Sequence, residues 1–253
     1  MICLVDMEHE EVAQRGSRCA VLKAPGCSVP QAYLEDVRRR LEAIANDPCV
    51  IRRYTDVTQA WLDGTGLRAL VLSGNVTAWD RYDQANLQAL AQIVRTASLP
   101  ILGLCGGLQF IALAHGAEVA PIRELRGGER DIKAHLGSGY FKEWGFTPVR
   151  VVAPDPLFEK LEAPVFLEAH YCEVKSLPPG FELLASTDIC RVQAFRQSGT
   201  LVYGTQFHPE AYTSGPVDRN TWLVDLVYPN GYTQRQPDGL RLLANFFHVA
   251  GLI

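Results

Sequence analysis

The first 120 residues alternate short apolar runs with longer stretches in which apolar residues recur every three or four positions. Short runs are typical of strands buried on both faces, and the longer spacing is typical of helices that bury one face. The runs lie at 2–5, 49–54, 69–72 and 101–104, and the helical spacing lies at 30–45, 83–96 and 108–116. This alternation predicts an α/β fold with a doubly wound, mostly parallel central sheet and flanking helices, in which ligands bind beyond the carboxyl ends of the strands.

The second half of the chain has a different pattern, with short β-like runs separated by turn residues. We expect strands at 147–152, 165–167, 181–185, 191–195 and 201–206, and a final helix at 239–250. The stretches 121–146 and 211–238 are rich in glycine, proline and charged residues, so we expect no regular structure there. No internal repeat or low-complexity linker divides the chain. We therefore expect one domain over residues 1–253, with an additional β-rich segment in its second half.

The composition limits which kinds of binding partner and which cellular compartment we expect. The 24 Lys and Arg against 28 Asp and Glu give a net charge of −4, so the chain lacks the basic surplus that holds a phosphate backbone, and we expect no nucleic acid partner. No apolar run approaches the roughly 20 residues of a membrane helix, so we expect no membrane contact and a cytoplasmic location. Seven cysteines without a C-x-x-C pair predict neither a disulfide framework nor a zinc site. We expect no metal and no cofactor.

A cysteine between a predicted strand and a predicted helix is the first candidate for chemistry. The segment Gly103-Leu104-Cys105-Gly106-Gly107 places glycine on both sides of Cys105, as a tight strand-to-helix turn requires. The amino end of a helix favours the thiolate form of such a cysteine, and the amide of Gly106 points to where an oxyanion would form. A buried structural cysteine in a glycine-rich turn has the same local pattern, so this segment alone leaves both interpretations open.

A histidine with a nearby carboxylate follows the last predicted strand. A thiol nucleophile needs a base, and the segment 204–210 offers His208. In an extended segment His208 and Glu210 point to the same side, so Glu210 can orient the imidazole while His208 faces the thiol. Pro209 fixes the backbone between them and is tolerated at the end of a strand.

Three segments, in this order, carry a resemblance to a known family. They are Leu72-Ser73-Gly74, Gly103-Leu104-Cys105-Gly106-Gly107-Leu108-Gln109 and Gly204-Thr205-Gln206-Phe207-His208-Pro209-Glu210. Together they resemble the class I, or triad, glutamine amidotransferases, and the resemblance covers residues 65–250. Members of this family are α/β proteins in which a cysteine attacks the side-chain amide of glutamine. The attack releases ammonia and leaves a γ-glutamyl thioester that water hydrolyses.

The resemblance implies a role for each matching residue. Cys105 matches the nucleophile, His208 the acid and base, and Glu210 the carboxylate that orients the histidine. The segment His170-Tyr171-Cys172 lies where the family places backbone contacts to the α-amino and carboxylate groups of the substrate. The implied substrate-binding residues are Gly74, Asn75, Gly106, Gln109, Tyr171 and Cys172.

The loop after Gly74 departs from the family pattern, which usually continues with a second glycine and then Pro-Gly. This chain has Asn75-Val76-Thr77 instead. Asn tolerates the left-handed backbone region better than other non-glycine residues, so Asn75 is still expected to supply a donor, whereas Thr77 is expected to reshape the loop. Ala169 also stands where several members carry a polar side chain. We therefore expect a pocket for glutamine or for another γ-glutamyl compound.

The resemblance leaves two possibilities for the reaction in which the chain takes part. No G-x-x-x-x-G-K-[ST] phosphate loop occurs, so the resemblance implies a glutaminase unit that delivers ammonia to a separate ATP-dependent synthetase subunit. The alternative is a free-standing γ-glutamyl peptide or amine hydrolase with the same Cys-His-Glu triad.

Two interpretations from other classes also stay open. In an α/β-hydrolase with a cysteine elbow the acid precedes the histidine by many residues, so the position of Glu210 argues against that fold. A catalytically silent amidotransferase-like sensor or scaffold gives no reason to keep Cys105, His208 and Glu210 together, although the altered loop at 75–77 favours it.

Overall fold

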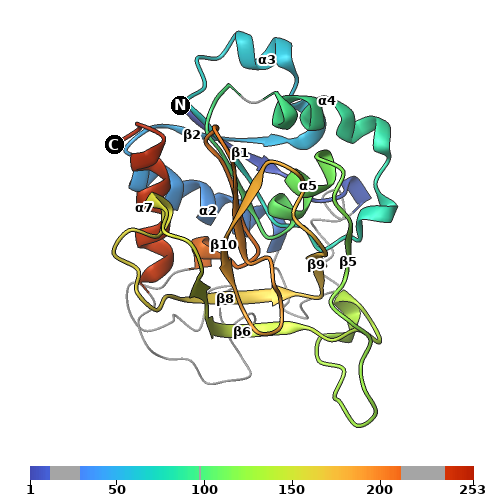
Figure 1. The fold of residues 1–253 in the computed structure, drawn as a ribbon. Coiled ribbons are helices and arrows are strands. Elements are labelled where there is room, and N and C mark those ends of the chain that lie inside the picture. Colours follow the sequence, from blue (N-terminus) through green and yellow to red (C-terminus); the bar gives the residue numbers. More distant parts are fainter. Residues whose placement is uncertain (12–28, 97, 212–236) are drawn as a thin grey trace.

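The central feature of the computed structural model is a sheet of eight strands with helices on both faces (Figure 1), seen within the described residues 1–11, 29–96, 98–211 and 237–253. Its strands are β1 (Ile2–Asp6), β2 (Cys49–Arg53), β3 (Ala69–Leu72), β4 (Ile101–Leu104), β7 (Arg150–Val151), β10 (Phe181–Ser186), β11 (Ala194–Gln197) and β12 (Val202–Thr205). The spatial order is β2–β1–β3–β4–β12–β11–β10–β7. Neighbours from β2 to β12 are parallel, and β11, β10 and β7 continue the sheet antiparallel. The expected mostly parallel sheet with a β-rich second half is confirmed.

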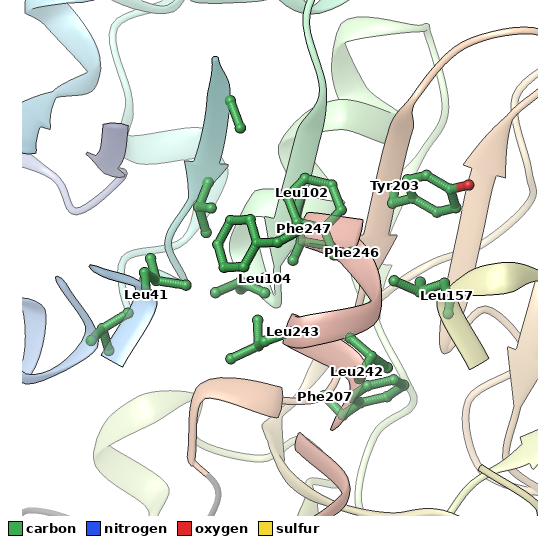
Figure 2. Packing of buried hydrophobic residues seen from close by; sticks show 14 of the residues in the cluster. Leu41, Leu102, Leu104, Leu157, Tyr203, Phe207, Leu242, Leu243, Phe246 and Phe247 are labelled. Carbon is green, nitrogen blue, oxygen red and sulfur yellow. The ribbon is translucent and has the colours of Figure 1, made fainter. Parts of the chain in front are cut away.

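Strands β1, β3 and β4 are buried on both faces, which is why their sequences are almost entirely apolar, whereas the edge strand β2 is partly exposed. In β1, Ile2 and Leu4 face one core cluster, and Cys3 and Val5 face the other. The helices that cover the two faces are α2 (Val29–Ala45), α3 (Gln59–Asp63), α4 (Gln84–Arg95), α5 (Gly106–Ala114) and α7 (Asp238–Val249). Figure 2 shows α7 packed against the sheet, with its Phe247 close to Leu102 and Leu104 of β4.

Helix α4 illustrates how the local sequence fixes an element. The Asp83 side chain caps its first turn by accepting a hydrogen bond from the amide of Ala85 at 2.9 Å. The apolar stripe predicted from the sequence is the face that the helix buries, and it comprises Leu87, Leu90, Ile93 and Val94. Across the described residues we find no helix with the length and apolar character that crossing a bilayer requires.

Two short antiparallel sheets lie beside the main sheet, and the sequence analysis placed them incorrectly. One pairs β5 (Val119–Pro121) with β9 (Cys172–Val174), and the other pairs β6 (Glu143–Pro148) with β8 (Val165–His170). The single strand expected at 147–152 is two strands in two different sheets: β6 ends at Pro148, and β7 begins at Arg150 and pairs with β10. The stretch 121–146, expected to be irregular, contains the start of β6.

Other boundaries also differ from those expected. The strand expected at 165–167 continues to His170, and the one expected at 191–195 begins only at Ala194. The short helix α3 and the strand β9 were not expected. The stretch 211–238 lies almost entirely outside the described residues.

Candidate active site

Cys105 occupies a sharp turn between β4 and α5. Its backbone angles are φ +50° and ψ −104°, a region that non-glycine residues rarely adopt. The Cys105 amide donates to the carbonyl of Thr205 at 2.7 Å, which ties the turn to the end of β12. A Cβ at Gly103 would lie 2.5 Å from the backbone of Gly107, and one at Gly107 would overlap the carbonyl of Leu72. The flanking glycines are therefore required sterically, and Cys105 is only 5% exposed.

His208 and Glu210 lie beyond the carboxyl end of β12, directly beside this turn. Strands β4 and β12 are parallel neighbours in which Leu104 pairs with Thr205, so the residues that follow them meet at one edge of the sheet. The His208 amide donates to the carbonyl of Leu167 on β8 at 2.9 Å, and His208 Nδ1 lies 2.7 Å from Glu210 Oε1. The structure thus brings the imidazole and the carboxylate together as expected.

The backbone that makes this contact differs from the one expected. Residues Pro209–Ala211 form a turn of 3₁₀ helix, not an extended segment, so Glu210 reaches back to His208 across a turn. The first turn of α7 packs on this segment, because a Cβ at Gly239 would overlap the carbonyl of Pro209. The Glu210 side chain is fully buried there.

The imidazole and the thiol approach each other over Gly74. A Cβ at Gly74 would lie 3.3 Å from His208 Cε1 and 3.5 Å from Cys105 Cβ, so a larger residue would press on both. Burial lowers the pKa of His208, but the neighbouring Glu210 and Cys105 outweigh burial and raise it well above its ordinary value. Interactions with His208 and a hydrogen bond from Tyr33 keep the pKa of Glu210 low in spite of burial. These directions favour an imidazolium beside a carboxylate.

Asn75 and Gly106 lie face to face beside the thiol. A Cβ at Gly106 would lie 2.9 Å from the backbone nitrogen of Asn75 and would overlap its side-chain oxygen. Within the described residues neither of these two amides donates a hydrogen bond to the protein. The arrangement therefore leaves two N–H groups for an oxyanion beside Cys105.

The loop that carries Asn75 is not held by a left-handed backbone, so that part of the sequence interpretation was wrong. Asn75 has no positive φ; its side-chain amide instead donates to the Thr77 carbonyl at 2.7 Å and to the Tyr82 hydroxyl at 3.0 Å. Glu8, just after β1, accepts from the Val76 amide at 2.8 Å and from the Thr77 hydroxyl at 2.6 Å. Side-chain hydrogen bonds thus replace glycine as the means of shaping this loop.

The pocket beside Cys105 contains several of the residues expected to bind substrate. It is lined by residues 75–79, Cys105, Gln109, Leu136 and residues 169–172. Gln109 is engaged with the protein itself: it accepts from Trp79 Nε1 at 2.9 Å and donates to the Cys172 carbonyl at 3.0 Å. Burial raises the pKa of the Cys172 thiol to about 11, so this cysteine is a neutral wall residue at pH 7.

A buried charged cluster lies behind the pocket wall. His170 Nε2 is 3.1 Å from Glu143 Oε2 and 3.2 Å from Glu168 Oε2, while His170 Nδ1 is 2.9 Å from the Cys172 carbonyl. Burial lowers the pKa of His170, but the two carboxylates outweigh it and raise it to about 10. Glu143, His170 and Cys190 bring potential metal-ligand atoms within 4.8 Å of one another.

The sequence analysis missed residues that support the site from distant elements. Tyr33 on α2 contacts Glu210, Gln206 contacts the Cys105 sulfur, and Glu8 holds the loop at 75–77. Gln206 belongs to one of the motifs that carried the family resemblance, so that motif was the available signal for it. Tyr33 and Glu8 belong to no motif, and their contacts arise only from the tertiary fold.

Comparisons with known proteins agree with the fold and the motifs. The family model described as glutamine amidotransferase class-I matches residues 31–221. A glutamine-hydrolysing GMP synthase subunit of Methanocaldococcus jannaschii is 31% identical over 179 residues, which are 70% of this chain and 82% of that protein. The corresponding subunit of Pyrococcus furiosus is 33% identical over 188 residues, 74% and 88% of the two chains. A provisionally assigned GMP synthase subunit from Thermoplasma acidophilum has a similar structure, with a TM-score of 0.63, 25% identity and coverage of 99% and 94%.

Proposed function

Since the chain belongs to the class I glutamine amidotransferases, which are glutamine-hydrolysing enzymes with a cysteine nucleophile, we propose that Cys105, His208 and Glu210 are its catalytic triad. The reaction is hydrolysis of the side-chain amide of glutamine through a γ-glutamyl thioester on Cys105, which releases glutamate and ammonia. The observation that carries this proposal is the meeting of three groups at one edge of the sheet: a thiol on a strained turn at a helix start, an imidazole beside it, and a buried carboxylate 2.7 Å from that imidazole.

The first half of the reaction forms the thioester. The Cys105 sulfur attacks the δ-carbon of glutamine, a carbon–sulfur bond forms, and the carbonyl oxygen becomes an oxyanion. The amides of Asn75 and Gly106, which lie next to each other, are proposed to receive that oxygen. The His208 imidazolium then gives its proton to the amide nitrogen, the carbon–nitrogen bond breaks, and ammonia leaves.

The second half releases glutamate. His208, now neutral, takes a proton from water, and the resulting hydroxide attacks the thioester carbon. The carbon–sulfur bond breaks, its electron pair returns to sulfur, and glutamate departs with the triad in its starting state. Glu210 keeps the imidazole oriented and stabilises its charged form in both halves. Gly74, Gln109, Tyr171 and Cys172 are proposed to hold the substrate in the adjacent pocket.

The ammonia is proposed to pass to a synthetase on a separate chain. Support comes from the relatives, which are named as one lettered subunit of a glutamine-hydrolysing GMP synthase, a name that implies at least one further subunit. By that likeness, the partner to try first is the synthetase subunit of a GMP synthase.

The test is release of ammonia and glutamate by the purified chain from glutamine, with Cys105→Ala as the blank. The assay is repeated with γ-glutamyl peptides and γ-glutamyl amines, and again in the presence of the synthetase. We expect glutamine to be turned over, or to acylate Cys105 until the partner is added. Preference for γ-glutamyl peptides or amines would overturn the amidotransferase assignment in favour of a free-standing hydrolase, and no reaction at Cys105 under any condition would leave only the silent scaffold.

A further inference from the structure

Three side-chain hydrogen bonds in series end on the sulfur of Cys105. Trp79 Nε1 donates to Gln109 Oε1 at 2.9 Å, Gln109 Nε2 donates to Gln206 Oε1 at 3.1 Å, and Gln206 Nε2 donates to Cys105 Sγ at 3.4 Å. Gln109 Nε2 also donates to the Cys172 carbonyl at 3.0 Å. The series therefore runs from the pocket wall to the nucleophile.

The chemistry of the partners fixes the direction of the whole series. An amide side chain can present either its oxygen or its nitrogen, and the two ends have nearly the same shape. The Trp79 indole, however, is a donor only, so Gln109 must turn its oxygen to Trp79. The Cys172 carbonyl is an acceptor only, so it selects the nitrogen of Gln109 on the other side. Two independent neighbours thus set one orientation of Gln109.

That orientation is passed on to Gln206. Because Gln109 donates an N–H group to Gln206, Gln206 must accept it with its oxygen. The N–H group of Gln206 then faces Cys105. The Gln206 side chain is fully buried, and its backbone amide donates to the Gln193 carbonyl at 2.8 Å. A reversed Gln206 would oppose its nitrogen to the nitrogen of Gln109 in a fully buried position, and both N–H groups would lose their acceptor.

We propose that Gln206 is a further catalytic residue, whose N–H group holds the Cys105 sulfur and favours its thiolate, and that Gln109, oriented by the Cys172 carbonyl and Trp79 together, is the positioning residue that imposes this donor. The inference rests on the proposed function, in which Cys105 is the nucleophile. The donor acts where sulfur carries charge: in the resting thiolate, and again when the carbon–sulfur bond of the thioester breaks and its electron pair returns to sulfur. Gln206 thus assists the sulfur both as the attacking thiolate and as the leaving group when the thioester is hydrolysed.

The test is the rate at which iodoacetamide alkylates Cys105 at fixed pH, read by mass spectrometry of the peptide that contains it. Gln206→Met keeps the length of the side chain but removes the donor, and we expect alkylation to slow about tenfold. Gln206→Glu keeps the shape and the contact to Gln109 but presents an acceptor, so its rate should be lower still. Trp79→Phe should change the rate by less than about threefold, because the Cys172 carbonyl still orients Gln109.

Gln197→Met on β11 is the matched control, because Gln197 lies on the neighbouring strand and does not contact the sulfur. Its alkylation rate should equal that of the wild type. If Gln206→Met fails to fold, the isosteric Gln206→Glu decides the question alone. Alkylation of both Gln206 variants at the wild-type rate would overturn the inference.

The readout separates this inference from the proposed function, because alkylation needs no glutamine. If the alkylation rate depends on Gln206 but the chain does not hydrolyse glutamine, the role of Gln206 as donor is supported and the proposed function is rejected. If the Gln206 variants are alkylated at the wild-type rate and the chain does hydrolyse glutamine, the role of Gln206 as donor is rejected and the proposed function stands.

Discussion

The hydroxyl of Tyr33 donates to Glu210 Oε1 at 2.5 Å, the same carboxylate oxygen that lies 2.7 Å from His208 Nδ1. Helix α2 thereby reaches the proposed triad from the far side of Glu210. Burial and the Glu210 carboxylate raise the pKa of Tyr33 well above its ordinary value, so the hydroxyl is protonated and can donate between pH 6 and 9. Tyr33 is not part of the pocket wall, and its effect on catalysis is therefore expected to pass through Glu210.

Tyr33→Phe should lower kcat for glutamine by about 3- to 10-fold and leave KM nearly unchanged, because it removes one hydrogen bond that holds the carboxylate. Steady-state kinetics between pH 6 and 9 measures this. Tyr54→Phe is the matched control: within the described residues the buried Tyr54 hydroxyl has no hydrogen-bond partner. Equal kinetics for the two variants would show that Tyr33 does not position Glu210.

Cys105→Gly should be more stable than Cys105→Ala by about 1 kcal/mol, the reverse of the usual order. The angles φ +50° and ψ −104° strain alanine, whereas for glycine they are the mirror image of an ordinary extended conformation. Urea unfolding of the two inactive variants measures the difference. Ala244→Gly in α7 is the reference and should lose about 1 kcal/mol. A less stable Cys105→Gly would mean that the turn stores no strain.

Gly106→Ala should abolish turnover and cost about 2 kcal/mol of stability, because the added methyl group overlaps Asn75 and forces the two amides apart. Gly64→Ala provides the comparison: a Cβ there meets nothing closer than 3.7 Å, and Gly64 already has helical angles, so its stability should stay the same or rise slightly. The assay is glutamine turnover together with thermal unfolding. An active Gly106→Ala would exclude the Asn75 and Gly106 amides as the oxyanion site.

The cluster of Glu143, Glu168 and His170 should make stability fall as the pH rises. The pKa of His170 is about 10 in the fold against an ordinary value of about 6.5, so its contribution is complete below about pH 6.5 and is lost as the pH approaches 10. Burial also raises the pKa of Glu168, which acts in the same direction. Thr187 and Gln193 hold Glu143 by neutral hydrogen bonds, and the Cys190 thiol lies nearby.

Glu168→Gln should therefore flatten the decline in the free energy of unfolding between pH 7 and 10, since it removes one carboxylate that holds the proton on His170. Urea unfolding at several pH values gives the slopes. The exposed Glu162→Gln should keep the wild-type slope. A Glu168→Gln slope as steep as that of the wild type would contradict the predicted protonation of His170.

The parallel half of the fold could be predicted because strands buried on both faces are almost entirely apolar, as are residues 2–5 of β1 and strands β3 and β4. The second half could not be bounded in the same way. Strand β6 begins with Glu143, a buried carboxylate whose partners lie on other segments, and no local pattern distinguishes it from a solvated glutamate. The separate strand β7 likewise depends on pairing with β10, which is distant in the chain.

For the site, short motifs predicted Cys105, His208 and Glu210. The glycines that a tight turn requires, and a carboxylate two residues from a histidine, can be recognised in the local sequence. The contacts of Tyr33 and Glu8 join elements that are distant in the chain, and no spacing rule reports them. The conformation of Asn75 was inferred from intrinsic backbone preference. In the structure, tertiary hydrogen bonds to Thr77 and Tyr82 decide it instead.

Strand β12 lies between β4 and β11, although it follows both of them in the chain. This order determines when, during synthesis, His208 can reach Cys105. The turn at Cys105 is tied to Thr205, and the imidazole reaches the thiol only after β12 has paired with β4. A ribosome-bound chain that ends before residue 208 therefore contains Cys105 without its proposed base. Because chains grow from the amino terminus and parallel pairing between distant strands is slow, the nucleophile is assembled late in folding.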